Sequence, residues 1–355
     1  MSFKAVVKLI ACNVLIGTTG LFLIEILFGN WISPNRLNRL NLIRNADLSY
    51  DVSHLYPSDH QVVYRRDRYG LRGWYKDPGS IDIMTVGGST TDERYVSEGE
   101  TWPDILRQDF LAEGKTVSVV NAGVDGQSTY GHIKNFDWWF PEIPRLKVGY
   151  FLFYIGINDF YKNANYKFDE LFKGNISVKE KIKERSALYY LFRTLRGLYL
   201  AKVVEKADSR RIDFKNLSWT DTSLVSDHEG LMRADLAGYE ERLRILGEKV
   251  RVWQAKPIFV TQSARSYKKA GGKILGVATT RSYKGATVNE LDYYYMMQIL
   301  NGKTLEVCRA LEGICLDLAN ELELDEQDLY DFSHTAPQGS RKIGHYLYEK
   351  LKAYF

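Results

Sequence analysis

Ser89 is the residue in this 355-residue chain whose surroundings first suggest chemistry, since two glycines precede it and two threonines follow it at residues 87–91. Glycines before a serine permit a tight turn and leave the hydroxyl accessible, and a following helix would point free N–H groups at the same place. Such a hydroxyl becomes a nucleophile once a base removes its proton. The same residue types also form ordinary turns and phosphate-binding loops, but the lysine of a Walker loop is missing.

His334 is the best candidate for that base among the six histidines. Asp331 precedes it by three residues, and the sequence places both on one loop between the last apolar run and the last helical pattern. A carboxylate in this position can hold the imidazole in the right tautomer and stabilise the imidazolium. An Asp-x-x-His pair is common, however, and a capping aspartate beside a surface histidine is the alternative interpretation.

Acyl transfer also needs hydrogen-bond donors for the developing oxyanion. The segment 121–128, with glycines at 123 and 126, lies just past a second apolar run, and Asn158 lies just past a third. A glycine can offer an unhindered backbone N–H, and the Asn158 amide offers two donors without carrying charge. Either segment could be a simple turn, but their position after successive runs favours a shared site.

These candidate residues follow short apolar runs that alternate with helical patterns after residue 80. Continuously apolar runs of this length argue for a parallel sheet that is covered on both faces. An open α/β sheet carries its active site at the carboxyl ends of its strands. We therefore predict an α/β fold with strands over 81–86, 117–121, 149–154, 257–261 and 314–318.

Three segments do not follow this alternation. Residues 31–80 are predicted to be an irregular, aromatic-rich connector that packs on a catalytic domain over 81–355. Two insertions are predicted within that domain, a basic and aromatic one at 161–222 and a loop at 264–290. The helical pattern at 186–204 could form a cap, lie on a membrane surface, or pack on the sheet with its basic face in water.

The overall composition excludes some functions and leaves others open. A net charge of +4 is too slight to argue for nucleic acid as a partner. The three cysteines show no metal-ligand spacing. Cys12 does not fit a lipoprotein processing site, because the N-terminal apolar run comes mostly after this cysteine and not before it. In an oxidising compartment Cys308 and Cys315 could bridge the end of a helix to the next strand, and the sequence leaves this open.

The four polar segments together resemble the SGNH (GDSL-type) hydrolases, a family named for a serine, glycine, asparagine and histidine in separate blocks. In this resemblance Ser89 is the nucleophile, and the Ser89 and Gly126 N–H groups with the Asn158 amide form the oxyanion hole. Asp331 and His334 complete the catalytic triad.

The resemblance extends from about residue 80 to the C-terminus. Gly88 departs from the family, which has an aspartate at that place, although this residue is not part of the triad. The family implies a flavodoxin-like three-layer α/β/α sandwich with five parallel strands, and neither a metal nor an organic cofactor.

The N-terminal segment predicts a membrane anchor. Residues 9–28 are almost continuously apolar. A run of this length is what an α-helix needs to cross the hydrocarbon core. Lys4 and Lys8 precede them, and no small-x-small cleavage site follows before Trp31, so residues 1–30 are expected to stay as an uncleaved signal anchor rather than a removed signal peptide. A buried helix of a soluble protein is the alternative.

The two sets of flanking charges disagree about orientation. Lys4 and Lys8 favour a cytoplasmic N-terminus, whereas Arg36, Arg39 and Arg44 oppose it. Partly from the family resemblance, we expect the catalytic domain on the periplasmic or extracellular side.

The resemblance implies an esterase in which Ser89 attacks an ester carbonyl, His334 takes its proton and Asp331 orients His334. An exported, membrane-anchored member would be suited to removing acyl or acetyl groups from a cell-surface glycan or lipid, or from an acylated small molecule. Two alternatives remain: an O-acyltransferase that uses the same triad on a polysaccharide, and a catalytically inactive, membrane-tethered binding protein.

Overall fold

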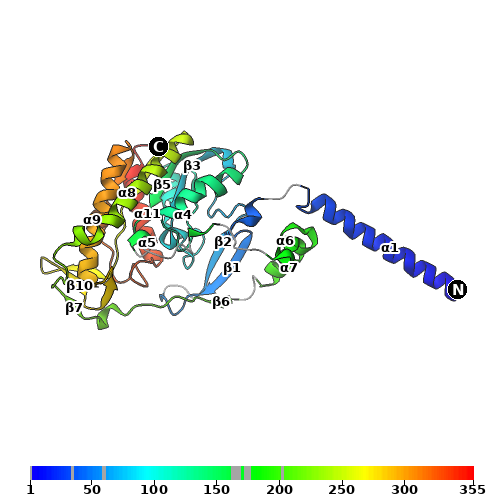
Figure 1. The fold of residues 1–355 in the computed structure, drawn as a ribbon, viewed down its shortest axis with the longest axis horizontal. Helices are drawn as coiled ribbons and strands as arrows, with labels where there is room; N and C mark the ends of the chain where they lie inside the picture. The colour runs from blue at the N-terminus through cyan, green and yellow to red at the C-terminus, as the bar shows by residue number, and fades with distance from the viewer. Residues whose placement is uncertain (1, 33–35, 58–60, 161–168, 172–176, 201–203) are drawn as a thin grey trace. The chain divides into compact units, whose positions relative to one another are not determined.

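The computed structural model describes residues 2–32, 36–57, 61–160, 169–171, 177–200 and 204–355 (Figure 1). The chain divides into two compact units. The smaller unit comprises Met1–Asn41 and Phe172–Val203, and the larger comprises Leu42–Leu171 and Val204–Phe355. The predicted insertion at 161–222 therefore contributes to both units, and its residues 161–168, 172–176 and 201–203 lie outside the described part.

A parallel sheet of five strands forms the centre of the larger unit, in the order β13-β8-β5-β3-β4. The chain begins inside the sheet, adds one neighbour and then crosses over, which is the doubly wound order of flavodoxin-like folds. The predicted fold class is confirmed, and the predicted strands agree with the observed ends to within two residues. The strands are β3 (Ile81–Gly87), β4 (Val119–Asn121), β5 (Val148–Tyr154), β8 (Lys256–Val260) and β13 (Ile314–Leu316).

Helices cover both faces of this sheet, as Figure 1 shows. On one face α3 (Trp102–Ala112) and α11 (Pro337–Leu351) share a buried apolar cluster with all five strands. On the other face, Phe151 packs against Trp253 at the end of α8 (His228–Val252). The helix α9 (Glu290–Ala310) lies beside α8 and begins with a capping box, in which Asn289 and Asp292 satisfy each other's backbone N–H groups.

Shorter elements fill the connections. The helices among them are α2 (Ser89–Asp92), α4 (Thr129–Lys134), α5 (Ile157–Phe160) and α10 (Leu318–Glu321). Single 3₁₀ turns occur at Arg36–Arg39, Pro78–Ser80, Phe140–Glu142 and Phe214–Asn216, and a π turn occurs at Asn135–Trp139.

The expectation of an irregular connector is wrong for part of 31–80. The strands β1 (Ala46–Asp51) and β2 (Gln61–Arg66) pair antiparallel, and β6 (Val204–Lys206) adds to β1 in parallel. Alternate side chains of β2, at Val62, Tyr64 and Arg66, are buried. Arg66 interrupts the alternation of apolar and polar residues that is typical of a half-buried strand. A count of apolar residues alone therefore does not reveal β2.

The expectation of a loop over 264–290 is also wrong. Two antiparallel hairpins occupy this segment, and Gly271 and Gly272 form the turn of the first hairpin. Two glycines between short runs are a hairpin signal in their own right. The hairpin strands are β9 (Tyr267–Ala270), β10 (Lys273–Val277), β11 (Thr280–Tyr283) and β12 (Ala286–Asn289). A further strand from the first insertion, β7 (Trp219–Thr220), pairs with β10.

The smaller unit is helical. Its long helix α1 (Phe3–Phe28) is the one helix in the described part of the chain that is long and apolar enough to cross a membrane. Two further helices, α6 (Val178–Arg185) and α7 (Ala187–Leu200), complete the unit. The helix predicted at 186–204 is confirmed as far as Leu200.

Candidate active site

Ser89 is the first residue of α2, directly after β3, and Asn158 lies in α5, directly after β5. Both therefore lie at the carboxyl edge of the central sheet. Asp331 and His334 lie on the loop between α10 and α11. The structure brings these four residues together from three separate parts of the sequence.

Ser89, His334 and Asp331 form a continuous hydrogen-bonded chain. The His334 Nε2 atom lies 2.7 Å from Ser89 Oγ, and His334 Nδ1 lies 2.7 Å from Asp331 Oδ2. The second oxygen of Asp331 accepts the backbone N–H groups of Ser333 and His334, each at 2.8 Å. The ring of Tyr330 stacks on the imidazole at 5.7 Å between centroids, so the ring plane is held as well.

In the pair of Asp331 and His334, each residue favours the charged form of the other. Burial on its own lowers the pKa of His334, but the hydrogen bond and negative charge of Asp331 outweigh burial and raise that pKa above its ordinary value. Burial likewise acts to raise the pKa of Asp331, but the hydrogen bond to His334, the charge of His334 and the two backbone hydrogen bonds together outweigh burial and lower that pKa. An ionised Asp331 favours the tautomer with the proton on Nδ1, which leaves Nε2 free to accept the proton of Ser89.

A cavity of about 130 Å³ lies in front of Ser89. Ser89, Asn158 and His334 line it, together with polar groups such as Gln127, His132, Asp159 and Gln262. Gly126 is not among the lining residues, although its neighbour Gln127 is. Gly126 has a φ of 72°, a conformation that glycine adopts without strain, and it turns the chain just before Gln127.

Asn158 is fixed by the loop that follows β4. Its Nδ2 atom donates one hydrogen bond to the Gln127 carbonyl at 2.8 Å, and the amide has a second N–H. A Cβ atom added to Gly88 would lie 2.2 Å from this Nδ2. The Asn158 amide thus lies where a side chain at position 88 would begin, so a larger residue there would require this amide to move.

Gln262, directly after β8, joins the Ser89 turn to the Asn158 turn. Its Nε2 donates to Thr90 Oγ1 at 2.8 Å, and its Oε1 accepts the Ile157 N–H at 2.8 Å. Gln262 was not among the residues predicted from the sequence. A polar side chain directly after the fourth predicted strand was the signal that could have found it.

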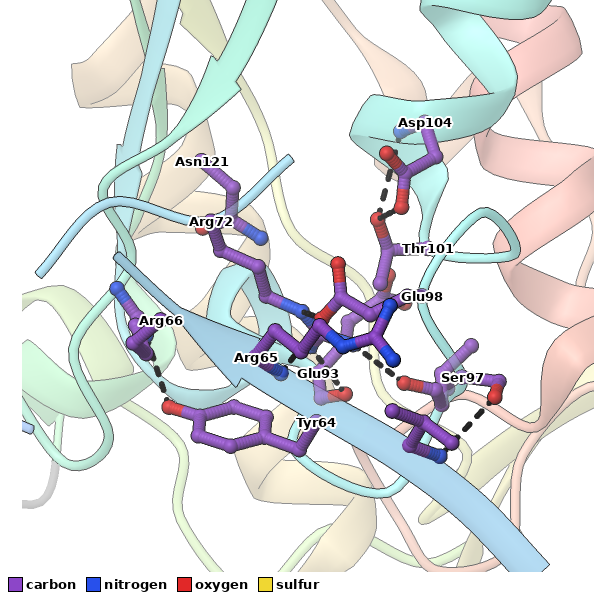
Figure 2. Close-up of polar contacts among 12 residues, drawn as sticks. Tyr64, Arg65, Arg66, Arg72, Glu93, Ser97, Glu98, Thr101, Asp104 and Asn121 are labelled. Carbon is purple, nitrogen blue, oxygen red and sulfur yellow. Dashed lines mark hydrogen bonds and ion pairs between the residues drawn. The ribbon is translucent and has the colours of Figure 1, made fainter. Parts of the chain in front are cut away.

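Two buried arginines, Arg66 and Arg72, hold the end of α2, and neither was predicted from the sequence. Figure 2 shows both side chains with Tyr64, Glu93 and Glu98. The Arg66 guanidinium bonds the Asp92 carboxylate, and it donates to the Gly123 carbonyl at 2.6 Å. Arg72 donates to the Glu93 carbonyl at 2.8 Å and pairs with Glu98 at 2.6 Å. Their side chains are 4% and 0% exposed, so these contacts are shielded from water.

Glu93 connects the Ser89 side of the site to the His334 side. Its carboxylate accepts hydrogen bonds from the hydroxyls of Thr335 and Ser340 and from the backbone N–H of Trp102. Thr335 directly follows His334 in the sequence. Burial raises the pKa of Glu93 to about 7, against the opposing effect of those hydrogen bonds.

No group of three or more His, Cys, Asp or Glu side chains that could hold a metal ion occurs within the described ranges. The cavity presents the hydroxyl of Ser89 and the imidazole of His334, together with the amide side chains of Gln127, Asn158 and Gln262.

Neither a protein-family model nor a curated protein matches the chain. Solved structures with a similar fold include TesA, with 13% sequence identity over 77% of this chain and 99% of that one and a TM-score of 0.44. A second is a catalytic mutant of Axe2, an acetylxylan esterase from Geobacillus stearothermophilus, with 11% identity, coverage of 77% and 94%, and a TM-score of 0.44.

A third similar structure is the psychrotrophic esterase EstA from Pseudoalteromonas sp., with 10% identity, coverage of 78% and 98%, and a TM-score of 0.40. The low identities and TM-scores of these three structures assign no function to this chain.

Proposed function

We propose that the protein is a serine esterase in which Ser89 is the nucleophile, His334 the general base and Asp331 the residue that orients His334. The observation that carries this proposal is the pair of 2.7 Å contacts from His334, one to Ser89 Oγ and one to Asp331. A serine in this arrangement gives up its proton to the imidazole as it attacks a carbonyl carbon.

The reaction then follows in two halves. Ser89 Oγ bonds to the ester carbonyl carbon, its proton moves to His334 Nε2, and the carbonyl oxygen becomes an oxyanion. The N–H groups of Ser89 and Gly126 and the amide of Asn158 stabilise that charge. Collapse of the intermediate expels the alcohol, which takes the proton from His334. Water then attacks the acyl carbon as His334 takes its proton. The bond from that carbon to Ser89 Oγ breaks, Oγ regains a proton from His334, and the carboxylic acid is released.

The size of the cavity supports a short acyl group such as acetyl. Pockets for drug-sized ligands commonly measure about 300–1,000 Å³, whereas this cavity measures about 130 Å³. Its polar lining suits the hydroxyl-rich alcohol of a glycan ester better than a hydrocarbon chain. We therefore propose an acylated glycan or glycolipid as the substrate class.

Membrane anchoring is the second part of the proposal. The helix α1 is long and apolar enough to cross a bilayer, and the disulfide between Cys308 and Cys315 supports an oxidising compartment for the larger unit. Together they favour a retained signal anchor with the catalytic unit in the periplasm or outside the cell.

The test is hydrolysis of p-nitrophenyl acetate by the purified full-length protein. We expect Ser89→Ala to reduce turnover by at least about 10³-fold, and Ser282→Ala, at an exposed serine of β11, to leave it unchanged. Turnover that survives Ser89→Ala would contradict the assignment. A fluorophosphonate probe should label the parent and the Ser282→Ala variant but not the Ser89→Ala variant, and folded parent protein without label would favour an inactive binding protein.

A second assay separates hydrolysis from transfer. The same acyl donor is supplied with and without candidate polysaccharides, and free acid and acylated glycan are both measured. Acylated glycan as the main product would identify an O-acyltransferase that uses the same serine.

A further inference from the structure

Glu25, near the end of the apolar helix α1, caps the start of α7. Its carboxylate accepts the hydroxyl of Ser186, the backbone N–H of Ala187 at 3.0 Å and that of Leu188 at 3.3 Å. Trp31 donates its indole N–H to the same carboxylate at 2.9 Å. These contacts supply acceptors for N–H groups that the first turn of a helix leaves without partners.

A backbone contact adds to this junction, because the Asn30 N–H donates to the Arg185 carbonyl at 2.8 Å. The end of α1 is thus part of the fold of α6 and α7. A leader that is cut away after export would remove the cap of α7, and the junction therefore argues that α1 is retained.

The position of Glu25 along α1 sets the depth of this junction in a bilayer. Lys8 and Glu25 bound the uncharged part of α1. At 1.5 Å per residue the distance between them is about 26 Å, close to the ~30 Å thickness of the hydrocarbon core. With Lys8 at one interface, Glu25 and the start of α7 lie at the headgroup layer of the other. Trp31 beside them is the residue type that prefers that layer.

The helices α6 and α7 expose apolar side chains that no described part of their own unit covers. Leu191, Phe192 and Leu195 of α7 are 53%, 58% and 58% exposed, and Ile182 of α6 is 51% exposed. Basic residues accompany them: from Val178 to Leu200 the sequence has six lysines and arginines and two glutamates. Apolar side chains with an excess of cations are the pattern of helices that lie in the interface of an anionic bilayer.

We propose that α6 and α7 are interfacial helices, which Glu25 docks at the end of α1 and whose exposed side chains enter the headgroup layer of the membrane. This inference rests on the membrane anchor proposed above and is independent of the reaction at Ser89. The lipid bilayer is the chosen occupant because α1 carries the junction to headgroup depth and because the excess of cations suits anionic lipid.

The test uses the full-length protein in nanodiscs that contain anionic lipid. In a Cys12→Ser background, which removes the free cysteine, single cysteines are introduced by Leu195→Cys on α7 and by Ile16→Cys on α1 and labelled with the fluorophore NBD. Quenching by lipids with a doxyl group near the headgroup is measured for Leu195→Cys, and by lipids with a doxyl group deep in the chain for Ile16→Cys. Free NBD-labelled cysteine serves as the aqueous reference.

We expect both labels to be quenched at least about twofold, since interfacial helices enter the headgroup and acyl boundary. Glu25→Ala should reduce the quenching at Leu195→Cys and leave that at Ile16→Cys unchanged. Thr18→Ala is the matched control, because the Thr18 hydroxyl bonds only within α1, and it should alter neither signal.

Quenching at Ile16→Cys without quenching at Leu195→Cys would overturn the inference and leave the anchor in place. Quenching at neither position would overturn both. A label at Leu195→Cys that is shielded from water but not quenched by lipid would mean that protein, such as a second copy of this chain, covers the helix, and would also overturn it. Ester hydrolysis by the same nanodiscs tests the role of Ser89 separately.

Discussion

Ser89 and His334 meet in one site, but the molecule holds them in different ways. His334 is held by its own loop, where Asp331 binds both the imidazole and two backbone N–H groups. The Ser89 turn is held at the far end of α2 by Arg66 and Arg72, which come from a distant part of the sequence and are buried.

The difference predicts a separation of activity from stability. Few long-range contacts depend on the Asp331 carboxylate, so a change there should affect the reaction more than the fold. The guanidinium of Arg66, by contrast, is buried opposite an equally buried Asp92. Removing one partner of such a pair leaves a charge without compensation and destabilises the folded state strongly.

The largest effect is expected for Asp331→Asn on the reaction. We expect kcat/KM to fall by about 10⁴-fold, because an amide does not hold the imidazole in the required tautomer. The free energy of unfolding, measured in urea, should change by less than about 1 kcal/mol because asparagine keeps an acceptor for the loop N–H groups. A variant that is both inactive and unfolded would show that the loop is not held locally.

Arg66→Met should produce the opposite result. We expect a loss of about 3–5 kcal/mol in the free energy of unfolding, measured by urea denaturation. Arg65→Met is the matched control in the same strand: Arg65 faces solvent, its ion pair with Asp47 is more than half exposed, and its loss should stay within about 0.5 kcal/mol. Similar losses for both variants would refute a special role for the buried arginine.

Glu93 allows a test of the connection between the two sides. Its pKa of about 7 in the folded protein exceeds the ordinary value of 4.5, so the folded state binds its proton more tightly than the unfolded state. The stability from this group is complete below pH 4.5 and is lost as the pH rises to about 7, by up to about 3 kcal/mol. Glu93→Gln should remove this pH dependence, which denaturant midpoints at pH 5 and pH 8 would measure for both proteins. Parallel pH profiles would contradict a buried Glu93 that titrates in this range.

The smallest effect concerns the acid limb of kcat/KM. His334 must be neutral to accept the serine proton, so the rate falls as the pH drops through its pKa, which Asp331 raises. In the residual activity of Asp331→Asn this limb should move to lower pH, because the charge that raises the pKa is gone. A limb that stays in place would assign it to another group.

The same contrast determines what could be predicted from the sequence. The strands and the Asp331–His334 pair were predictable because their signals are local, namely short apolar runs and a spacing of three residues. The order of such local segments after successive strands indicated a shared site for Ser89 and Asn158, and the proposed role of Gly126 came from the family resemblance.

The arginine contacts were not predictable in this way. Arg66 and Arg72 act on Asp92, Glu93 and Gly123, and only the folded chain brings these residues close. An arginine on the buried face of β2 also breaks the alternation by which a half-buried strand is found. Local sequence patterns therefore do not reveal how the Ser89 side of the site is held, because that side depends on long-range ion pairs.

Position 88 is structurally coupled to position 158, which is distant in the sequence. Any side chain larger than hydrogen at 88 would collide with the Asn158 amide as it stands. A side chain at 88 therefore requires the Asn158 amide, the far end of a flexible side chain, to rotate away from its hydrogen bond with the Gln127 carbonyl. A search pattern that demands a carboxylate before the serine would pass over this chain, whereas one that also accepts glycine there would recover it.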